Sequence, residues 1–333
     1  MPKVVLIDIN INSVPGGRDP SPLAKVCERE GYNLEIWDLR EPDEIIEKVK
    51  DADAIVTIYT KIDRQILEHC KNLKVAIRAA VGPDVFNLDD CTEFNVPACN
   101  VPNYSTQEVA AHTVTLALAL ARRIAVSNHL VHSGQWNISC ARNVHRLSTM
   151  TMGFVGFGRI ARQAAEYAGG FGFTICAYDP YLPAQVFEQA GVKQVSTDEL
   201  FQTCDIICVN TPLTESTRHI IDHDAVSKMK DGVCIVNTGR GACIETAALV
   251  DGLRSGKICG VGLDVIEEEP LRDKDAEILQ FENVIITSHT GYASEEAKVD
   301  QYRLCGETIV QVLNGELPDN VLNRDALLKH KRT

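Results

Sequence analysis

Three side chains in the second half of the chain are of the types that a carbonyl reduction needs. Arg240 lies in the string Asn237-Thr238-Gly239-Arg240-Gly241, Glu269 is the last of three consecutive glutamates, and His289 follows an apolar run. An arginine can hold a carboxylate with its forked donor face and polarise an adjacent carbonyl. A histidine can exchange a proton with the carbonyl or hydroxyl oxygen, and a glutamate can orient the imidazole and stabilise its protonated form.

Each of these residues alone has an ordinary structural interpretation. Arg240 beside glycines fits a surface loop, the glutamates fit a solvated turn, and a histidine after a strand is often structural. However, all three residues follow predicted strands, and ligands of open α/β sheets bind at the carboxyl ends of the strands. Arg240, Glu269 and His289 are therefore the candidate catalytic residues.

A dinucleotide-binding fingerprint precedes them. Gly156-Phe157-Gly158-Arg159-Ile160-Ala161 follows the apolar run 152–155 and opens a helical pattern. Its glycines allow a tight turn and close backbone approach to a pyrophosphate, which sits on the helix N-terminus. Asp179 ends the next predicted strand, where an acid binds the ribose hydroxyls of NAD and opposes the 2′-phosphate of NADP. The pattern predicts NAD as the cofactor.

Composition excludes several other classes of function. The chain has 33 basic and 46 acidic residues and a net charge of -13, which disfavours nucleic acid and anionic membrane surfaces as partners. The most apolar segment, 114–121, is far shorter than the roughly 20 residues that a membrane-spanning helix needs. The first residues lack the pattern of a signal peptide, so we expect a cytoplasmic protein.

The twelve cysteines are scattered and include no Cys-x-x-Cys pair. Several lie in strand-like runs, so we expect reduced, small core residues. Cys204 and Cys208 could suggest a metal pair, but Cys208 belongs to a predicted strand and no nearby histidine or cysteine completes a site. His129 and His132, one helical turn apart, are expected at the surface or as caps. We predict no metal.

Strand and helix patterns alternate along the chain. Strands are predicted at 4–7, 34–37, 54–58, 74–78 and 96–100, with helices near 22–30 and 43–49, which favours a parallel sheet covered by helices. A capping box, Ser105-Thr106-Gln107-Glu108, opens a long apolar helix to about Arg123. From Thr151 on, a six-stranded Rossmann pattern is predicted, with strands at 152–155, 173–178, 205–209, 233–237, 258–264 and 284–287.

The end of the chain predicts how the two sheets are connected. A last amphipathic helix, about 294–313, ends at Gly315 as a C-cap. The tail beyond it has no strand to add, so we expect it to return to the first domain. The predicted substrate-binding domain is discontinuous, 1–103 and 295–333, and the NAD-binding domain comprises 104–294.

Several strings together resemble the D-isomer-specific 2-hydroxyacid dehydrogenase family over nearly the whole chain. They are Val81-Gly82-Pro83-Asp84, Asn100-Val101-Pro102-Asn103-Tyr104-Ser105, Gly156-Phe157-Gly158-Arg159-Ile160, Tyr178-Asp179-Pro180, Thr211-Pro212-Leu213-Thr214, Asn237-Thr238-Gly239-Arg240-Gly241, Leu263-Asp264-Val265-Ile266-Glu267-Glu268-Glu269-Pro270 and His289-Thr290-Gly291. The resemblance implies an α/β protein of two doubly wound parallel-sheet domains, with a Rossmann NAD-binding domain inserted into a flavodoxin-like substrate domain. It also implies a homodimer formed through the NAD-binding domain.

The resemblance further implies roles for individual residues. Arg240, Glu269 and His289 would be the catalytic residues, and Asp264 would meet the nicotinamide amide. Val81 and Gly82 would offer their backbone to the substrate carboxylate, with Tyr104 and Tyr292 as further substrate-binding residues. The cofactor-binding residues would be Gly156, Gly158, Arg159, Ile160, Asp179, Thr211, Pro212, Thr217, Thr238, Gly239 and Asp264.

The chain departs from the family pattern in a few places. It has Val109-Ala110-Ala111 where Val-Ala-Glu is usual, and Thr287-Ser288-His289 where Thr-Pro-His is usual. Tyr292 is similar to the aromatic position of the lactate dehydrogenase and C-terminal-binding-protein branches. The segment Asp179-Pro180-Tyr181-Leu182 also leans towards the second of these. An NAD(H)-sensing scaffold that binds other proteins therefore stays open beside the enzyme.

Substrate choice depends on loops of the first domain. Near its strand ends, only Lys61 and the more distant Arg18 could bind a phosphate, whereas neutral residues predominate in Asn10-Ile11-Asn12 and Tyr59-Thr60. A phosphorylated substrate needs cations around its distal group. We therefore expect a small unphosphorylated 2-oxo acid such as glyoxylate, hydroxypyruvate or pyruvate, interconverted with its D-2-hydroxy acid. D-3-phosphoglycerate dehydrogenase is the alternative activity.

Overall fold

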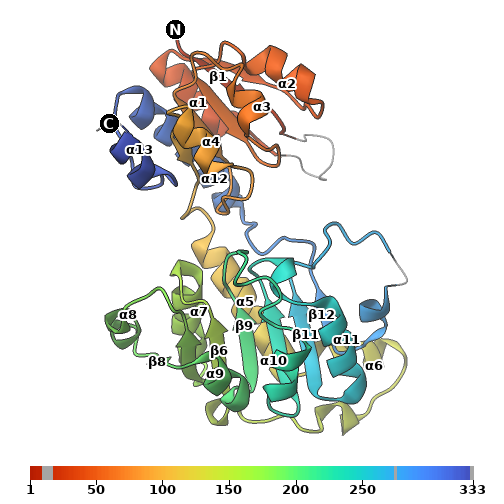
Figure 1. Ribbon diagram of the computed structural model, residues 1–333. Coiled ribbons are helices and arrows are strands. Elements are labelled where there is room, and N and C mark those ends of the chain that lie inside the picture. The colour runs from red at the N-terminus through yellow and green to blue at the C-terminus, as the bar shows by residue number, and fades with distance from the viewer. Residues whose placement is uncertain (10–17, 274–275, 331–333) are drawn as a thin grey trace. The chain divides into compact units, whose positions relative to one another are not determined.

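The computed structural model describes residues 1–9, 18–273 and 276–330, and these fold as two compact units. Unit 1 comprises Met1–Ser105 with Ala293–Thr333, and unit 2 comprises Thr106–Tyr292. Every paired strand in each sheet is parallel, and helices separate the strands in sequence (Figure 1). The predicted α/β class with two doubly wound parallel sheets is confirmed.

Unit 1 has a five-stranded sheet in the order β2-β1-β3-β4-β5, which is the flavodoxin-like order. Each central strand carries two apolar β-branched residues, and all four residues of β3 are buried. The strands are β1 (Lys3–Leu6), β2 (Asn33–Ile36), β3 (Ala54–Thr57), β4 (Val75–Arg78) and β5 (Ala98–Cys99). The helices among them are α1 (Ser21–Glu30), α2 (Pro42–Val49), α3 (Arg64–Leu67) and α4 (Leu88–Glu93).

The C-terminal segment of the chain packs into unit 1. Helix α12 (Glu295–Leu313) begins at the N-cap Ser294, whose hydroxyl accepts from the Ala297 amide, and it packs on α1 and β4. Gly306 permits this close packing, since a Cβ there would lie 2.8 Å from the Cβ of Val26. Asn323, just before α13 (Arg324–His330), accepts from the Ala98 amide over 3.0 Å. The N-terminal and C-terminal chain segments of unit 1 are thereby hydrogen-bonded to each other at β5.

Unit 2 has a seven-stranded sheet in the order β12-β11-β10-β9-β6-β7-β8. The sequence predicted six strands, and the additional one is β8, a two-residue edge strand with both residues exposed. The strands are β6 (Thr151–Val155), β7 (Thr174–Tyr178), β8 (Lys193–Gln194), β9 (Ile206–Val209), β10 (Val233–Asn237), β11 (Ile258–Leu263) and β12 (Val284–Ile286). The helices are α5 (Thr106–Ala121), α6 (Ile124–His132), α7 (Arg159–Gly170), α8 (Ala184–Gln189), α9 (Thr197–Thr203), α10 (His223–Lys228) and α11 (Thr246–Ser255).

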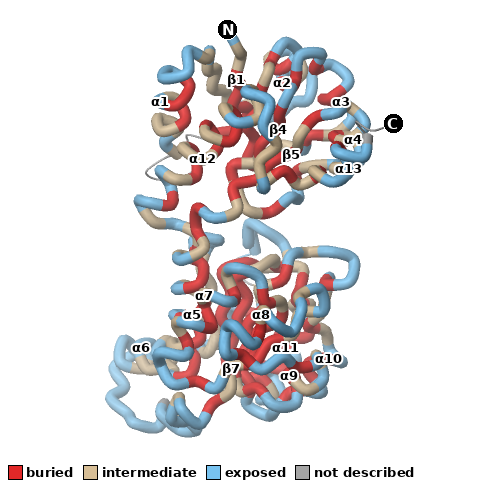
Figure 2. The backbone as a smooth tube through the Cα atoms, turned by 90° about the vertical axis from the view of Figure 1, so that its left-hand side faces the viewer, coloured by how far each residue is buried: buried red, intermediate tan, exposed pale blue. Residues whose placement is uncertain are grey.

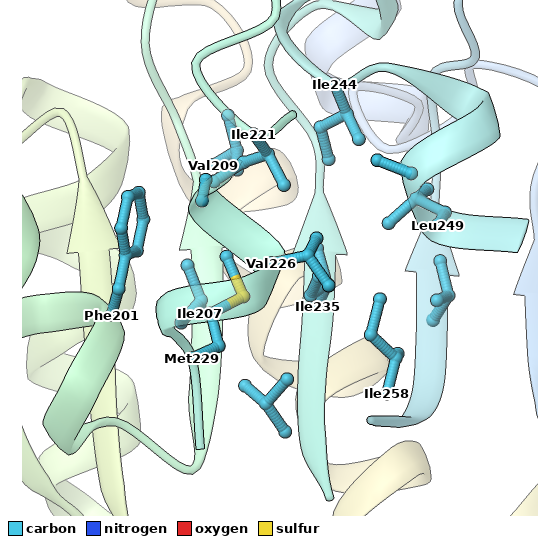
Figure 3. Packing of buried hydrophobic residues seen from close by; sticks show 14 of the residues in the cluster. Phe201, Ile207, Val209, Ile221, Val226, Met229, Ile235, Ile244, Leu249 and Ile258 are labelled. Carbon is cyan, nitrogen blue, oxygen red and sulfur yellow. The ribbon is translucent and has the colours of Figure 1, made fainter. Parts of the chain in front are cut away.

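The central strands of the unit 2 sheet are buried, and the tube in Figure 2 is coloured red for buried residues. Along β9, Ile207 faces one apolar cluster and Cys208 faces the other. The first cluster packs the sheet against α9, α10 and α11, and Figure 3 shows its residues interdigitating. The second packs it against α5 and α7. Strands that are buried on both faces of a sheet have sequences that are continuous apolar runs.

Helix α5 forms close to its predicted bounds but without its predicted cap. The hydroxyl of Ser105 is buried without a hydrogen-bond partner among the described residues, so the predicted cap bond is not made. The helix ends at Ala121, and Arg123, with φ of 52°, precedes α6.

Among the described residues, no single helix is long and apolar enough to cross a membrane. Helices α5 and α6 pass that test of length and composition only as a pair bent by 61°.

Candidate functional site

His289 and Glu269 are in contact beyond the ends of two paired strands. Nδ1 of His289 lies 2.7 Å from Oε2 of Glu269. His289 follows β12 and Glu269 lies in the loop after β11, and these strands pair in parallel. Oε1 of Glu269 accepts from the Ile266 amide over 3.3 Å, so the carboxylate is held by its own loop. The two side chains keep 47% and 36% of their surface exposed, which leaves the imidazole accessible to a small molecule.

Asp264, which is 3% exposed, holds the turn that carries His289. Its carbonyl oxygen accepts from the His289 amide over 2.8 Å, and its carboxylate accepts from the Thr290 and Gly291 amides over 2.9 Å each. His289 has φ of 55°, in the left-handed region that few residues other than glycine adopt. The bonds to Asp264 therefore offset local backbone strain at the histidine.

His112 belongs to the same hydrogen-bond network, and the sequence analysis missed it. From α5, its Nε2 lies 2.9 Å from Oγ1 of Thr287 and 3.5 Å from Oδ1 of Asp264. The Thr287 hydroxyl donates to the same Oδ1 over 2.6 Å. The one signal in the sequence is that His112 is the single ionisable residue within the helical pattern of 109–121.

Arg240 follows β10, the strand on the other side of β11. Asn237 fixes its turn by donating to the Arg240 carbonyl oxygen and accepting from the Gly239 amide, each over 3.0 Å. Gly241 packs so closely that a Cβ there would overlap the carbonyl of Ile266. The turn of Arg240 and the loop of Glu269 are thus packed against each other.

Glu267 joins the loop after β11 to the segments that carry His219 and Thr246. Its Oε2 accepts from the Thr246 amide over 2.9 Å, and its Oε1 lies 2.6 Å from Nε2 of His219. Partial burial raises the pKa of Glu267, but hydrogen bonds from Thr246 and His219 outweigh it and leave that pKa below its usual value. The carboxylate of Glu267 therefore bridges two loops beside the candidate site.

The glycine fingerprint forms the turn from β6 into α7. Gly156 has φ of 85°, and a Cβ there would lie 3.0 Å from Cα of Thr211, so a larger residue does not fit. Gly158 is the N-cap of α7, with open space where a side chain would lie. Asp179, after β7, accepts from the amides of Phe157 and Tyr181 over 3.0 Å each. An open helix N-terminus beside a fixed carboxylate fits the pyrophosphate and ribose of a dinucleotide.

The other predicted cofactor residues lie in loops after β9 and β10. Thr238 accepts from Asn210 Nδ2 over 3.0 Å and lies 2.7 Å from the Thr113 hydroxyl. Gly239 packs on the Thr211 carbonyl, and Pro212 is exposed.

The Thr217 hydroxyl donates to the Pro212 carbonyl over 2.6 Å and accepts from the Thr214 amide, so it is bonded within its own loop. Arg159 and Ile160 begin α7.

Unit 1 carries the residues predicted to bind the substrate carboxylate. The Val81 carbonyl accepts from Asn100 and the Gly82 carbonyl accepts from Arg78. No hydrogen bond to another described residue uses the amide N–H of either Val81 or Gly82. Two adjacent donors are therefore available for an anion. Tyr104 is buried.

The remaining predicted substrate contacts are partly described. Tyr292, in unit 2, places its ring edge-on to His289 with ring centres 6.4 Å apart. Arg18, expected to be distant, donates to the Tyr59 hydroxyl over 2.6 Å. Lys61 is exposed and lines a surface pocket. Asn10, Ile11 and Asn12 lie outside the described residues.

Comparisons with known proteins agree with this geometry. The family model for the D-isomer-specific 2-hydroxyacid dehydrogenase NAD-binding domain matches residues 114–291. Glyoxylate reductase of Thermococcus litoralis is 35% identical over 89% of this chain and 92% of its own length. The chain belongs to the D-isomer-specific 2-hydroxyacid dehydrogenase family. It is therefore an NAD-dependent oxidoreductase of that family, and the predicted NAD cofactor is confirmed.

Other members of this dehydrogenase family differ in their named activities. D-3-phosphoglycerate dehydrogenase of Methanocaldococcus jannaschii is 39% identical over 87% of this chain, which spans 55% of that relative's length. D-lactate dehydrogenase of Aquifex aeolicus, solved with NAD and lactic acid, superposes with a TM-score of 0.80 at 27% identity, over 94% of this chain and 96% of that one. The family thus includes both phosphorylated and unphosphorylated substrates.

Proposed function

We propose that this dehydrogenase reduces a short unphosphorylated 2-oxo acid to its D-2-hydroxy acid. The contact between His289 and Glu269 carries the proposal. An ionised carboxylate only accepts hydrogen bonds, so Glu269 requires a proton on Nδ1 of His289. Nε2 is then the atom that exchanges a proton with the substrate oxygen. Reduction needs a proton to give to the substrate oxygen, and oxidation needs an imidazole nitrogen that can accept one.

Each unit carries candidate donors for a substrate carboxylate. Arg240 supplies a permanent cation with a forked donor face, and the unpaired amides of Val81 and Gly82 supply two further donors. Tyr292 lies beside the His289 ring and would pack on the substrate. These contacts orient the carbonyl carbon and polarise its oxygen towards the imidazole.

The cofactor is assigned to the fingerprint turn and its neighbours. The open N-terminus of α7 after Gly158 would hold the pyrophosphate, and Asp179 would hold the ribose hydroxyls. When bound, NADH supplies the hydride. Within the described residues, Asp264 accepts from Thr287 and Thr290 through Oδ1 but from Gly291 alone through Oδ2. One acceptor position on Oδ2 therefore remains for the nicotinamide amide.

The charges of unit 1 favour an unphosphorylated substrate. The guanidinium of Arg78 is already paired with Asp84 over 2.8 Å. The pocket beside Lys61 is also lined by Asp63, Asp84 and Asp89, and these carboxylates would repel a phosphate. Glyoxylate, hydroxypyruvate and pyruvate carry no second anion and meet no such repulsion.

One observation favours the alternative, D-3-phosphoglycerate dehydrogenase. Arg18 lies on Tyr59, which follows β3, and its guanidinium is 5.4 Å from the ring centre. It could bind a distal phosphate if the substrate reached this side of the sheet. The Arg18→Ala variant distinguishes the two substrates, because only phosphoglycerate oxidation needs this cation.

A homodimer formed through the NAD-binding domain is part of the proposal. Ile124, Val131, Trp136 and Ile138 lie close in sequence, and each exposes about half or more of its surface. Exposed apolar side chains grouped in one segment are typical of an interface. Light scattering tests this by measuring the mass in solution. We expect the mass of a dimer, and the mass of a monomer would contradict the proposed interface.

Turnover and product stereochemistry test the proposed reaction. We expect NADH oxidation with hydroxypyruvate or pyruvate and a product of D configuration by chiral chromatography. NADH binding without turnover on any 2-oxo acid would instead support the NAD(H)-sensing scaffold. An L product would contradict the proposal.

A further inference from the structure

Two cysteines of unit 2 meet at the amino ends of β10 and β11. The sulfur of Cys234 lies 3.1 Å from the sulfur of Cys259, and both thiols are free. Cys234 is the second residue of β10 and Cys259 the second of β11, whereas Arg240 and Glu269 follow the other ends of these strands. The pair is separate from the site described above.

An irregularity in the strand pairing brings the two thiols together. Val233 pairs with Ile258, but Cys234 pairs with Gly260, so Cys259 is an extra residue between two pairs. Gly260 lies beside the pair, since its Cβ position would be in van der Waals contact, at 3.7 Å, with Sγ of Cys234. Adjacent strands are about 4.8 Å apart, which is within the Cα separation of disulfides. A bond therefore needs little backbone movement.

The two cysteines differ in exposure and in acidity. Cys259 is exposed and Cys234 is buried. The pKa of the Cys259 thiol is lowered by its hydrogen bond with Cys234 and by the Arg123 guanidinium, although the protein around the sulfur partly desolvates it. The pKa of Cys234 is raised by the same hydrogen bond and by burial. An accessible thiol beside a second thiol that can resolve its oxidised form is the usual arrangement of an oxidation-sensitive pair.

We propose that Cys259 and Cys234 form a reversible disulfide when the protein meets a peroxide. The Cys259 thiolate attacks one oxygen of hydrogen peroxide, the O–O bond breaks, and a sulfenic acid and hydroxide form. The Cys234 thiol then attacks the Cys259 sulfur, the S–O bond breaks, and the oxygen leaves as water. Two thiols are oxidised while one peroxide is reduced to two waters. A dithiol or phosphine restores both thiols.

A second pair in the same unit provides an internal control. The sulfurs of Cys176 and Cys204 are 3.3 Å apart, but both residues are buried. Proximity alone predicts that both pairs oxidise, whereas the exposure of Cys259 predicts that only Cys234 and Cys259 do. Comparing the two pairs within one sample separates these explanations.

The experiment uses the full-length reduced protein, a few equivalents of hydrogen peroxide, and alkylation under denaturing conditions. Trypsin releases Cys234 in the peptide 231–240 and Cys259 in the peptide 258–272. We expect these two peptides linked by a disulfide in most of the protein, a mass loss of two hydrogens, and full recovery after reduction. The 163–193 peptide of Cys176 should remain alkylated and unlinked.

Variants assign the roles of the two cysteines. Cys259→Ser should abolish the linkage, and Cys234→Ser should leave a Cys259 sulfenic acid that dimedone traps. Cys176→Ser, which changes the control pair, should leave the linkage intact. Full alkylation of Cys259 after peroxide treatment would overturn the proposal. A link between Cys259 residues of two chains, or oxidation of both pairs to the same extent, would also overturn it.

Discussion

The amide of His289 donates to the carbonyl oxygen of Asp264 over 2.8 Å, so the residue that directly follows β11 fixes the histidine that follows β12. The Asp264 carboxylate holds the next two amides of the same turn. The position of the imidazole therefore depends on Asp264 as well as on Glu269. This dependence predicts sensitivity at sites that do not touch the substrate.

Gly291→Ala should lower turnover strongly. A Cβ at this position would lie 2.7 Å from Oδ2 of Asp264 and 3.3 Å from the His112 ring, so the carboxylate must shift. Overpacking of this kind costs about 1–3 kcal/mol of unfolding free energy, and we expect kcat to fall by about tenfold or more. Gly170→Ala is the control, because nothing lies within 4 Å of its Cβ position. Equal kcat in the two variants would argue against the role of Asp264.

Glu269→Gln should lower kcat for reduction by about 10²- to 10⁴-fold, the usual contribution of an acid-base group. The amide keeps the size of the side chain but loses the charge that orients and stabilises the imidazolium. Steady-state kinetics with saturating NADH measure the effect. Glu268→Gln, an exposed neighbour, should retain wild-type activity. If both variants behave alike, the contact of Glu269 with His289 has no catalytic role.

Asp179→Ser should weaken the preference for NAD over NADP by about 10- to 100-fold, because a carboxylate beside the ribose repels the 2′-phosphate. The ratio of kcat/KM for the two cofactors is the measurement. Asp198→Ser, an exposed carboxylate on α9 of the same unit, should leave the ratio unchanged. A wild-type protein that prefers NADPH would contradict the assignment of Asp179.

Glu267→Gln should destabilise unit 2 at neutral pH by about 1–2 kcal/mol, since it weakens hydrogen bonds to a charged group. The pKa of Glu267 is lowered in the folded protein from its usual 4.5. Its charged form therefore adds stability above that value, and the contribution is lost as the pH falls through the lower, folded-state pKa. Urea unfolding at several pH values should show wild type and variant converging in acid. A constant difference from pH 7 to pH 3 would contradict this.

Much of the site follows from the sequence because parallel strands end at one edge of a sheet. The strand ends of β11 and β12 bring Glu269 and His289 together although 20 residues separate them. The position of the glycine turn follows from backbone sterics, and the position of Asp179 follows from the length of the next strand. Local rules of this kind are readable without knowledge of tertiary packing.

The features that the sequence missed depend on packing between distant segments. His112 reaches Asp264 only because α5 lies against β10 and β11. Strand β8 is two exposed residues, too short for a hydrophobic alternation. Cys259 was expected in the core, but it is exposed at the start of β11. Arg18 approaches Tyr59 across 41 residues.

The central claim is the reduction of a small 2-oxo acid, and a comparison of specificity constants tests it most directly. Reduction of glyoxylate, hydroxypyruvate and pyruvate with NADH is measured beside oxidation of 3-phosphoglycerate with NAD, using the same enzyme preparation. We predict a kcat/KM for at least one small oxo acid that exceeds the value for 3-phosphoglycerate and is unchanged in Arg18→Ala. A higher kcat/KM for 3-phosphoglycerate, lost in Arg18→Ala or Lys61→Ala, would contradict the account.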